Sequence, residues 1–287
     1  MLAIYKKDVR SAFHGMAGWV VCAFVVFVIG LYFMALCLSG GYGEFSYVLN
    51  NSMFMFLVVV PLLTMRSMVE ERRQKTDQLL LTSPVSISGI VWGKYLALLT
   101  VYAIPLLVAA ICPLIMSAFG SISLMRSYGS LLAFFLLGAA TLAIGLFMSS
   151  LTENQIIAAL CTFGTLILVY LMPSIASLIS STAFASVAAF TLVAAVACVL
   201  VFLMTKSVVL STGLFCLVEL VLFLMTRFTD VQFEGSFGKM LNTLALFDRF
   251  TTFVTGVFDL TAIVYYISIA LLFVFLTTQG IEKRRWS

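Results

Sequence analysis

Eight long apolar runs limit what this chain can fold into. About 20 helical residues, each rising about 1.5 Å, cross a hydrocarbon core about 30 Å thick. The runs are continuously apolar rather than alternating, which favours helices over a barrel. We therefore expect an all-α integral membrane protein with about eight transmembrane helices. The runs extend over 17–38, 53–69, 90–117, 129–149, 156–179, 183–205, 207–226 and 259–279.

The composition supports the same class of protein. Of the 287 residues, 63% are hydrophobic and 10% are charged, whereas a soluble domain carries roughly 25% charged residues. A water-soluble surface cannot be built from so few charges. The whole chain, 1–287, is therefore expected to form a single transmembrane domain.

The placement of lysine and arginine predicts the orientation in the membrane. If all eight runs span and the N-terminus is cytoplasmic, twelve of these residues lie inside and four lie outside. Both termini are then cytoplasmic, and the expected location is the bacterial inner or plasma membrane. Six spans, with 183–226 packed differently, is the alternative. The four outside residues are Arg126, Arg227, Lys239 and Arg249.

Two segments beside the runs are expected to be amphipathic. Residues 1–16 carry an apolar stripe with three basic residues off it, which predicts a helix in the inner interface beside anionic lipid; a frayed tail is the alternative. The stripe is Leu2, Tyr5, Val9, Phe13 and Met16, and the basic residues are Lys6, Lys7 and Arg10. Residues 228–258 are expected outside as an amphipathic or re-entrant helix. Their helically spaced apolar residues are Phe237, Met240, Leu241, Leu244, Phe247 and Phe250.

The sequence lacks the usual signatures of metal, haem and nucleotide sites. Its six cysteines lie in or at the ends of apolar runs with no C-x-x-C pair, and His14 is the only histidine. Such cysteines are typical of buried small side chains. There is no G-x-x-x-x-G-K-S/T phosphate loop. We expect no cofactor, no enzymatic activity in this chain itself and no nucleic-acid partner.

Glu219 is the only charged residue well inside an expected span. A charge at the bilayer centre costs about 2.5–3.5 kcal/mol on insertion scales, so such a residue is a candidate for function. The alternative is a protonated carboxyl that is hydrogen-bonded to a neighbouring helix. A lone carboxyl without a chain of other ionisable groups is weak support for a proton relay, and therefore for a secondary transporter.

The charged segment 70–84, EERRQKTDQLLLTSP, separates the second and third runs. Its mixed signs and the i,i+4 pair of Glu71 and Lys75 predict a short helix. Ser83 and Pro84 have the pattern of an N-cap followed by proline at the first helical position. We expect a compact cytoplasmic elbow that docks on a partner; a solvated loop is the alternative. Because exposed ion pairs contribute only about 0–1 kcal/mol, the fold is expected to tolerate their reversal.

Three stretches resemble one family. PLLTMRSMVEERRQKTDQLLLTSPVSISGIVWGKYLA and SSLTENQIIAALCTFG resemble the first and second cytoplasmic loops of type 2 ABC transporter permeases. FDRFTTFVTGVFDLTAIVYYISIALLFVFLTTQGIEKRRWS is similar to the C-terminal end of the same proteins, in the gliding-motility type subunit group. The resemblance does not extend to 180–247. Shorter members are expected to have six spans, so 183–226 would be a helical pair added to a six-helix core.

This resemblance implies a permease subunit of an ATP-driven ABC exporter. Such a subunit pairs with a second permease, as a copy or a paralogue, and with two separate ATPase subunits. It implies that 70–84 contains a coupling helix that rests in a groove of the ATPase. The implied docking residues are Glu70, Glu71, Arg72, Lys75, Thr76, Gln78 and Leu79. The alternatives are a secondary transporter or channel, and a membrane scaffold subunit that moves no substrate. The resemblance does not identify the substrate.

Overall fold

The computed structural model describes residues 1–41, 43–73, 86–119, 122–178, 186–191, 194–195, 198, 219 and 235–285. Across these ranges the regular structure is helical and contains no strand. Six stretches are long and apolar enough to cross a membrane, which confirms a multi-pass all-α membrane protein. They are Met16–Ser39, Phe45–Arg73, Ile87–Ala118, Leu124–Leu151, Gln155–Leu178 and Leu260–Lys283. The expected spans 183–205 and 207–226 lie mostly outside the described residues, so a total of eight stays a prediction.

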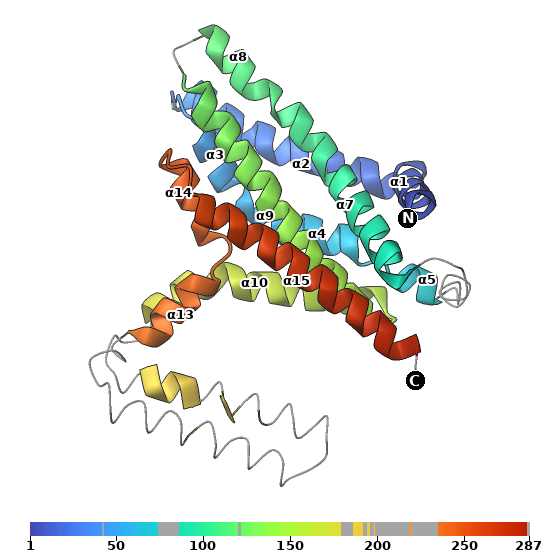
Figure 1. The fold of residues 1–287 in the computed structure, drawn as a ribbon. Helices are drawn as coiled ribbons and strands as arrows, with labels where there is room; N and C mark the ends of the chain where they lie inside the picture. Colours follow the sequence, from blue (N-terminus) through green and yellow to red (C-terminus); the bar gives the residue numbers. More distant parts are fainter. Residues whose placement is uncertain are drawn as a thin grey trace. The chain divides into compact units, whose positions relative to one another are not determined.

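The chain divides into two compact units, Met1–Leu168 with Arg249–Ser287, and Val169–Asp248. Most of the described helices belong to the first unit (Figure 1). In order they are α1 (Leu2–His14), α2 (Met16–Tyr32), the π-helix η1 (Phe33–Ser39), α3 (Phe45–Asn51), the 3-10 turn η2 (Met53–Met55), α4 (Phe56–Thr64), α5 (Val69–Arg73), α7 (Ile87–Ala109), α8 (Ile111–Phe119), α9 (Leu124–Leu151), α14 (Thr251–Val254) and α15 (Leu260–Arg285). α10 (Gln155–Leu178) crosses the boundary between the units, and α13 (Ser236–Leu244) belongs to the second.

α9 forms the centre of the first unit, packed along α15, α4 and α7. Small residues on α9 allow this close approach, as in many membrane helix pairs. A Cβ at Gly138 would lie 2.4 Å from ring atoms of Tyr102 on α7, and one at Gly145 would lie 2.7 Å from Thr64 Oγ1 on α4. The Tyr102 hydroxyl donates a hydrogen bond to Phe134 O over 2.9 Å. The middle of α9 is therefore fully covered by neighbouring helices.

α9 and α15 run in the same direction (Figure 1). Near the start of α9, the Ser130 hydroxyl donates to Phe253 O over 3.2 Å. Near its end, the rings of Phe147 and Phe273 have centroids 5.7 Å apart. The C-terminal ends of both helices lie at the same end of the first unit as α1, α5 and the start of α7 (Figure 1). We call this end of the first unit the elbow end; its assignment to the cytoplasm stays a prediction.

The N-terminal segment is a helix rather than a frayed tail. Ile4 is buried, and the Tyr5 hydroxyl lies 3.0 Å from Thr100 Oγ1 on α7. A Cβ at Gly93 of α7 would lie 3.2 Å from Met1 O, so the helix rests closely on α7. Trp19 closes the corner between α1 and α2 by donating from Nε1 to Phe13 O over 3.0 Å. The helical part of this prediction is confirmed, while its place in the inner interface stays a prediction.

Part of the expected outer segment 228–258 is also helical. α13 buries Phe237 and Leu241 and leaves Met240 and Leu244 exposed, as an amphipathic helix does. A 3-10 turn, η4 (Asp248–Phe250), then leads into α14. Phe250 is fully buried in the first unit, where its ring centroid lies 5.8 Å from that of Phe134 on α9. Residues 228–234 lie outside the described part of the chain.

Candidate functional site at the elbow

The elbow begins with α5, which continues from α4 through a tight turn. The amide of Ser67 donates to Thr64 O over 3.1 Å, and that of Glu70 donates to Arg66 O over 3.3 Å. Val69 is completely buried and anchors the first turn of α5. Glu70 beside it is exposed. Burial of Val69 therefore sets the direction in which each charged neighbour on α5 points.

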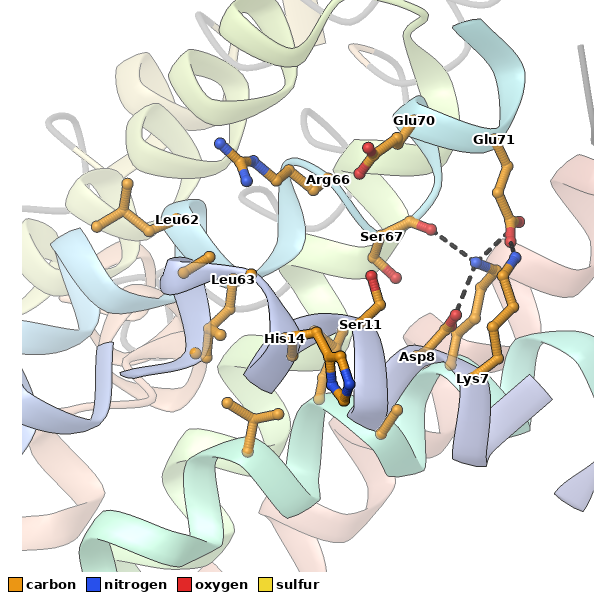
Figure 2. Close-up of a pocket in the computed structure, with 18 residues that line it drawn as sticks. Lys7, Asp8, Ser11, His14, Leu62, Leu63, Arg66, Ser67, Glu70 and Glu71 are labelled. Carbon is orange, nitrogen blue, oxygen red and sulfur yellow. Dashed lines mark hydrogen bonds and ion pairs between the residues drawn. The ribbon is translucent and has the colours of Figure 1, made fainter. Parts of the chain in front are cut away.

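Glu71 points inward, toward Lys94 of α7. Lys94 Nζ lies 2.8 Å from Glu71 Oε2 and 3.4 Å from Asp8 Oδ2, and it donates to Ser67 O over 2.7 Å. The Lys94 side chain is only 2% exposed. Glu71 accepts a second hydrogen bond at Oε1 from Lys7, over 2.9 Å. Figure 2 shows Asp8, Lys7 and Glu71 converging in this way from α1 and α5.

Lys7, Asp8, Glu71 and Lys94 form one charge network, which we call the elbow cluster. Its formal charges balance, so the buried ammonium of Lys94 is compensated by two carboxylates. Burial raises the pKa of Asp8 above its usual value and outweighs the opposing attraction of Lys94. The hydrogen bond to Glu71 raises the pKa of Lys7 and outweighs the effect of burial. The cluster joins α1, α5 and α7 at one point.

The structure places the predicted docking residues in different environments. Glu70 is exposed, as docking requires. Glu71 is 13% exposed and pairs with Lys94, so the premise that the ion pairs of the elbow are exposed is wrong for this residue. Whether the fold tolerates reversal of its charge stays a prediction. Residues 74–85 lie outside the described residues. The expected pair with Lys75, the Ser83–Pro84 start and the docking positions Lys75, Thr76, Gln78 and Leu79 fall among them.

Arg72 links the elbow to the loop between α9 and α10. Its Nη1 donates to Thr152 O over 3.4 Å. One turn earlier, the amide of Met68 donates to Ser149 Oγ near the end of α9, also over 3.4 Å. The stretches that resemble the first and second cytoplasmic loops of the permease family therefore touch each other at the elbow end.

Glu219 is a described helical residue of intermediate exposure. Its Oε1 is buried and makes no hydrogen bond with any residue that the structure describes. Because the residues on either side of it lie outside the description, its role as a functional carboxyl stays a prediction.

The sequence interpretation missed Asp8, Lys7 and Lys94 as members of the site. One signal was present: Lys94 is a lysine near the start of a long apolar run, and a buried ammonium there needs an acidic partner. The sequence did not show which of several nearby carboxylates would supply it, because that depends on how α1 and α5 pack on α7.

No protein-family model matches the chain, and a search of the curated proteins finds no match. The geometry of the elbow end, and the resemblance of three stretches to permeases, carry the functional hypothesis.

Proposed function

We propose that the protein is the membrane-spanning permease subunit of an ATP-driven ABC exporter of the cell membrane. In this proposal a separate ATPase subunit docks on residues 70–84. The observation that carries it is the elbow cluster, which connects the short helix α5 to both α1 and α7 through ion pairs of 2.8 and 2.9 Å. A segment that transmits motion from a docked partner needs a stiff connection to the spanning helices.

The elbow cluster provides such a connection. A force on α5 acts on Glu71, and Glu71 bonds Lys94 of α7 and Lys7 of α1. Pulling Glu71 away from Lys94 would leave a buried charge without its nearer carboxylate, which costs several kcal/mol. α5 and α7 are therefore expected to move as one body, whereas two elements joined by a solvated loop would not.

The motion of α7 has a route into the core of the first unit. The Tyr95 hydroxyl donates to Ala139 O over 3.0 Å, and Tyr102 does the same to Phe134 O. Both acceptors belong to α9. Arg72 adds a second contact, to the loop after α9. Closure of an ATPase against the elbow would thus act on α1, α7 and α9 together.

The docking face would be the outer side of α5 with residues 74–84. Glu70 is exposed on α5 and has no ion pair or side-chain hydrogen bond to any described residue, so its carboxylate is available to a cationic partner. The proposed assembly also contains a second permease, as a copy or a paralogue. Hydrolysis of ATP occurs on the partner and not on this chain.

The test is purification of the tagged chain from its native membranes in mild detergent, followed by identification of the proteins that accompany it. We expect a soluble subunit with a G-x-x-x-x-G-K-S/T motif, and ATP hydrolysis by the complex. Flux driven by an ion gradient through the chain alone in vesicles would contradict the proposal and favour a secondary transporter or channel. A complex that hydrolyses ATP and transports none of a broad panel of substrates would favour a scaffold subunit.

A further inference from the structure

A pocket of about 610 Å³ opens beside the elbow cluster, between α1, the start of α2, the end of α4 and α7. Its size is within the usual range for small-molecule sites. Figure 2 shows Arg66 and Glu70 on one side of it, and Ser11 and His14 on the other. The pocket is lined by residues of this chain and shares Glu70 with the proposed docking face.

The pocket has a polar level and an apolar level. At the polar level lie Arg66, Glu70 and Ser11 together with the elbow cluster. One to two helical turns further into the spanning helices, the lining includes Leu62, Leu98 and Val101. A phospholipid has the same order, with a charged headgroup above acyl chains. Water-soluble metabolites gain nothing from the apolar level.

Two charges in the pocket are available to a ligand. Neither Arg66 nor Glu70 forms an ion pair or a side-chain hydrogen bond with the residues that the structure describes. The elbow cluster, by contrast, already uses its charges internally. A guanidinium is well suited to a phosphate, and a carboxylate is suited to an ammonium group. Arg66 and Glu70 thus match a headgroup that carries both a phosphate and an ammonium group.

The formal charges of the lining favour a zwitterionic headgroup over an anionic one. Arg66, Lys7 and Lys94 are balanced by Asp8, Glu70 and Glu71, so the pocket has no net positive charge to attract an anion. An anionic headgroup on Arg66 would also approach Glu70, one turn away, with no ammonium to compensate. Glu70 therefore acts against anionic lipids.

The position of the pocket agrees with a lipid ligand. Trp19, 64% exposed at the corner of α1 and α2, is of the residue type that gathers where membrane meets water. α2 lines the pocket with Ala17 and Gly18 in its first turn, and α7 lines it between Lys94 and Val101. Its polar level is thus expected at the height of the headgroups, on whichever side of the membrane the elbow end lies.

We propose that this pocket binds one phospholipid whose headgroup carries a phosphate and a primary ammonium, with the phosphate on Arg66, the ammonium on Glu70 and an acyl chain along Leu62 and Leu98. The bound lipid would contact α1, α4 and α7 simultaneously, beside the elbow.

The test uses the full chain, delipidated in detergent, and native mass spectrometry with phosphatidylethanolamine and phosphatidylglycerol of identical acyl chains. Tighter binding of phosphatidylethanolamine is expected. Arg66→Gln should weaken that binding about tenfold, as loss of a charged hydrogen bond does. Glu70→Gln should also weaken the binding of phosphatidylethanolamine and reduce the preference for this lipid over phosphatidylglycerol. Leu62→Ala should produce a smaller loss.

Arg10→Gln and Glu153→Gln serve as matched controls, because both residues are exposed near the elbow end and neither lines the pocket. Equal lipid binding by Arg66→Gln and Arg10→Gln would overturn the proposal, and so would equal affinity for the two lipids. Displacement of bound lipid by millimolar inorganic phosphate, with the same dependence on Arg66, would show a phosphate site instead and overturn the lipid assignment.

Discussion

Lys94 Nζ lies 2.8 Å from Glu71 Oε2 while the Lys94 side chain is 2% exposed. A charge buried so deeply is costly unless it is paired, and Glu71 is the nearer of the two carboxylates beside Lys94. The first turn of the elbow is therefore part of the packed structure of the first unit. This relationship changes how the elbow should be tested.

The first prediction concerns the stability of that pair. Glu71→Gln should lower the free energy of unfolding by about 3 kcal/mol, because it leaves Lys94 buried with only the more distant carboxylate of Asp8 and the carbonyl of Ser67. Denaturation in mixed micelles measures the change. Glu70→Gln is the control, since an exposed neighbour should change stability by less than about 0.5 kcal/mol. Equal effects of the two variants would contradict the buried role of Glu71.

The second prediction concerns pH. Burial raises the pKa of Asp8, so the folded state binds this proton more tightly than the unfolded chain does. The contribution of Asp8 to stability is then greatest below the unfolded pKa of about 3.9 and is lost as the pH rises through the folded pKa. The stability of the wild type relative to Asp8→Asn should therefore decline as the pH rises from 4 to 7. A stability difference between the wild type and Asp8→Asn that stays constant across this pH range would contradict a raised pKa of Asp8.

The third prediction separates docking from folding. Glu70→Lys should leave the amount and stability of the protein in the membrane unchanged while weakening its association with the ATPase, because like charges that meet at an interface cost several kcal/mol. Co-purification from membranes measures the association. Glu153→Lys, on the loop after α9, is the matched control. Reversing Glu71 as well would confound the experiment, since that residue holds the fold together. An intact complex with Glu70→Lys would remove Glu70 from the docking face.

The fourth prediction concerns topology. Lys239 is exposed on α13, and the lysine and arginine distribution predicts that it lies outside the cell. In a cysteine-free background, Lys239→Cys should react with a membrane-impermeant thiol reagent in intact cells. Glu153→Cys, expected inside, should react only after the membrane is permeabilised. The opposite pattern would reverse the orientation, and labelling of both from one side would exclude the span arrangement.

The fifth prediction concerns the packing of α7 on α9. Gly138→Ala should destabilise the protein by about 1–3 kcal/mol, because the new methyl group would fall 2.4 Å from the ring of Tyr102, which is fully buried. Gly164→Ala on α10 is the control, since nothing lies within 4 Å of its Cβ position. There the substitution should be neutral or stabilising by up to about 1 kcal/mol. Comparable losses of stability at both sites would show that the close contact with Tyr102 is not the reason why alanine is unfavourable at position 138.

The spanning helices could be predicted from the sequence with good accuracy. The run expected over 129–149 is the helix Leu124–Leu151, and that expected over 156–179 is Gln155–Leu178. The second run is longer than expected: Phe45–Arg73 begins before the run 53–69 because α3 and η2 precede α4. Their residues are less uniformly apolar and are covered by protein, so hydropathy alone did not include them.

The candidate site could be predicted only in part. The position of the elbow was predictable, because a group of charges between two apolar runs must lie outside the hydrocarbon. Which of those charges face a partner was not predictable. Glu70 and Glu71 are identical in type and adjacent in sequence, yet Glu70 is exposed and the Glu71 side chain is only 13% exposed. Only the burial of Val69 and the approach of α7 distinguish them.

The sequence by itself determined that this is a membrane protein and which of its helices are apolar enough to span the bilayer. That information is local, because every apolar residue in a run contributes separately to transfer into the bilayer, and the backbone must then bond within its own helix. The tertiary structure decided the elbow cluster. Lys7 meets Glu71 across 64 positions and Lys94 meets Asp8 across 86. Such pairs form only when α1 folds back onto α7, and the side chains that guide this packing are spread over several helices.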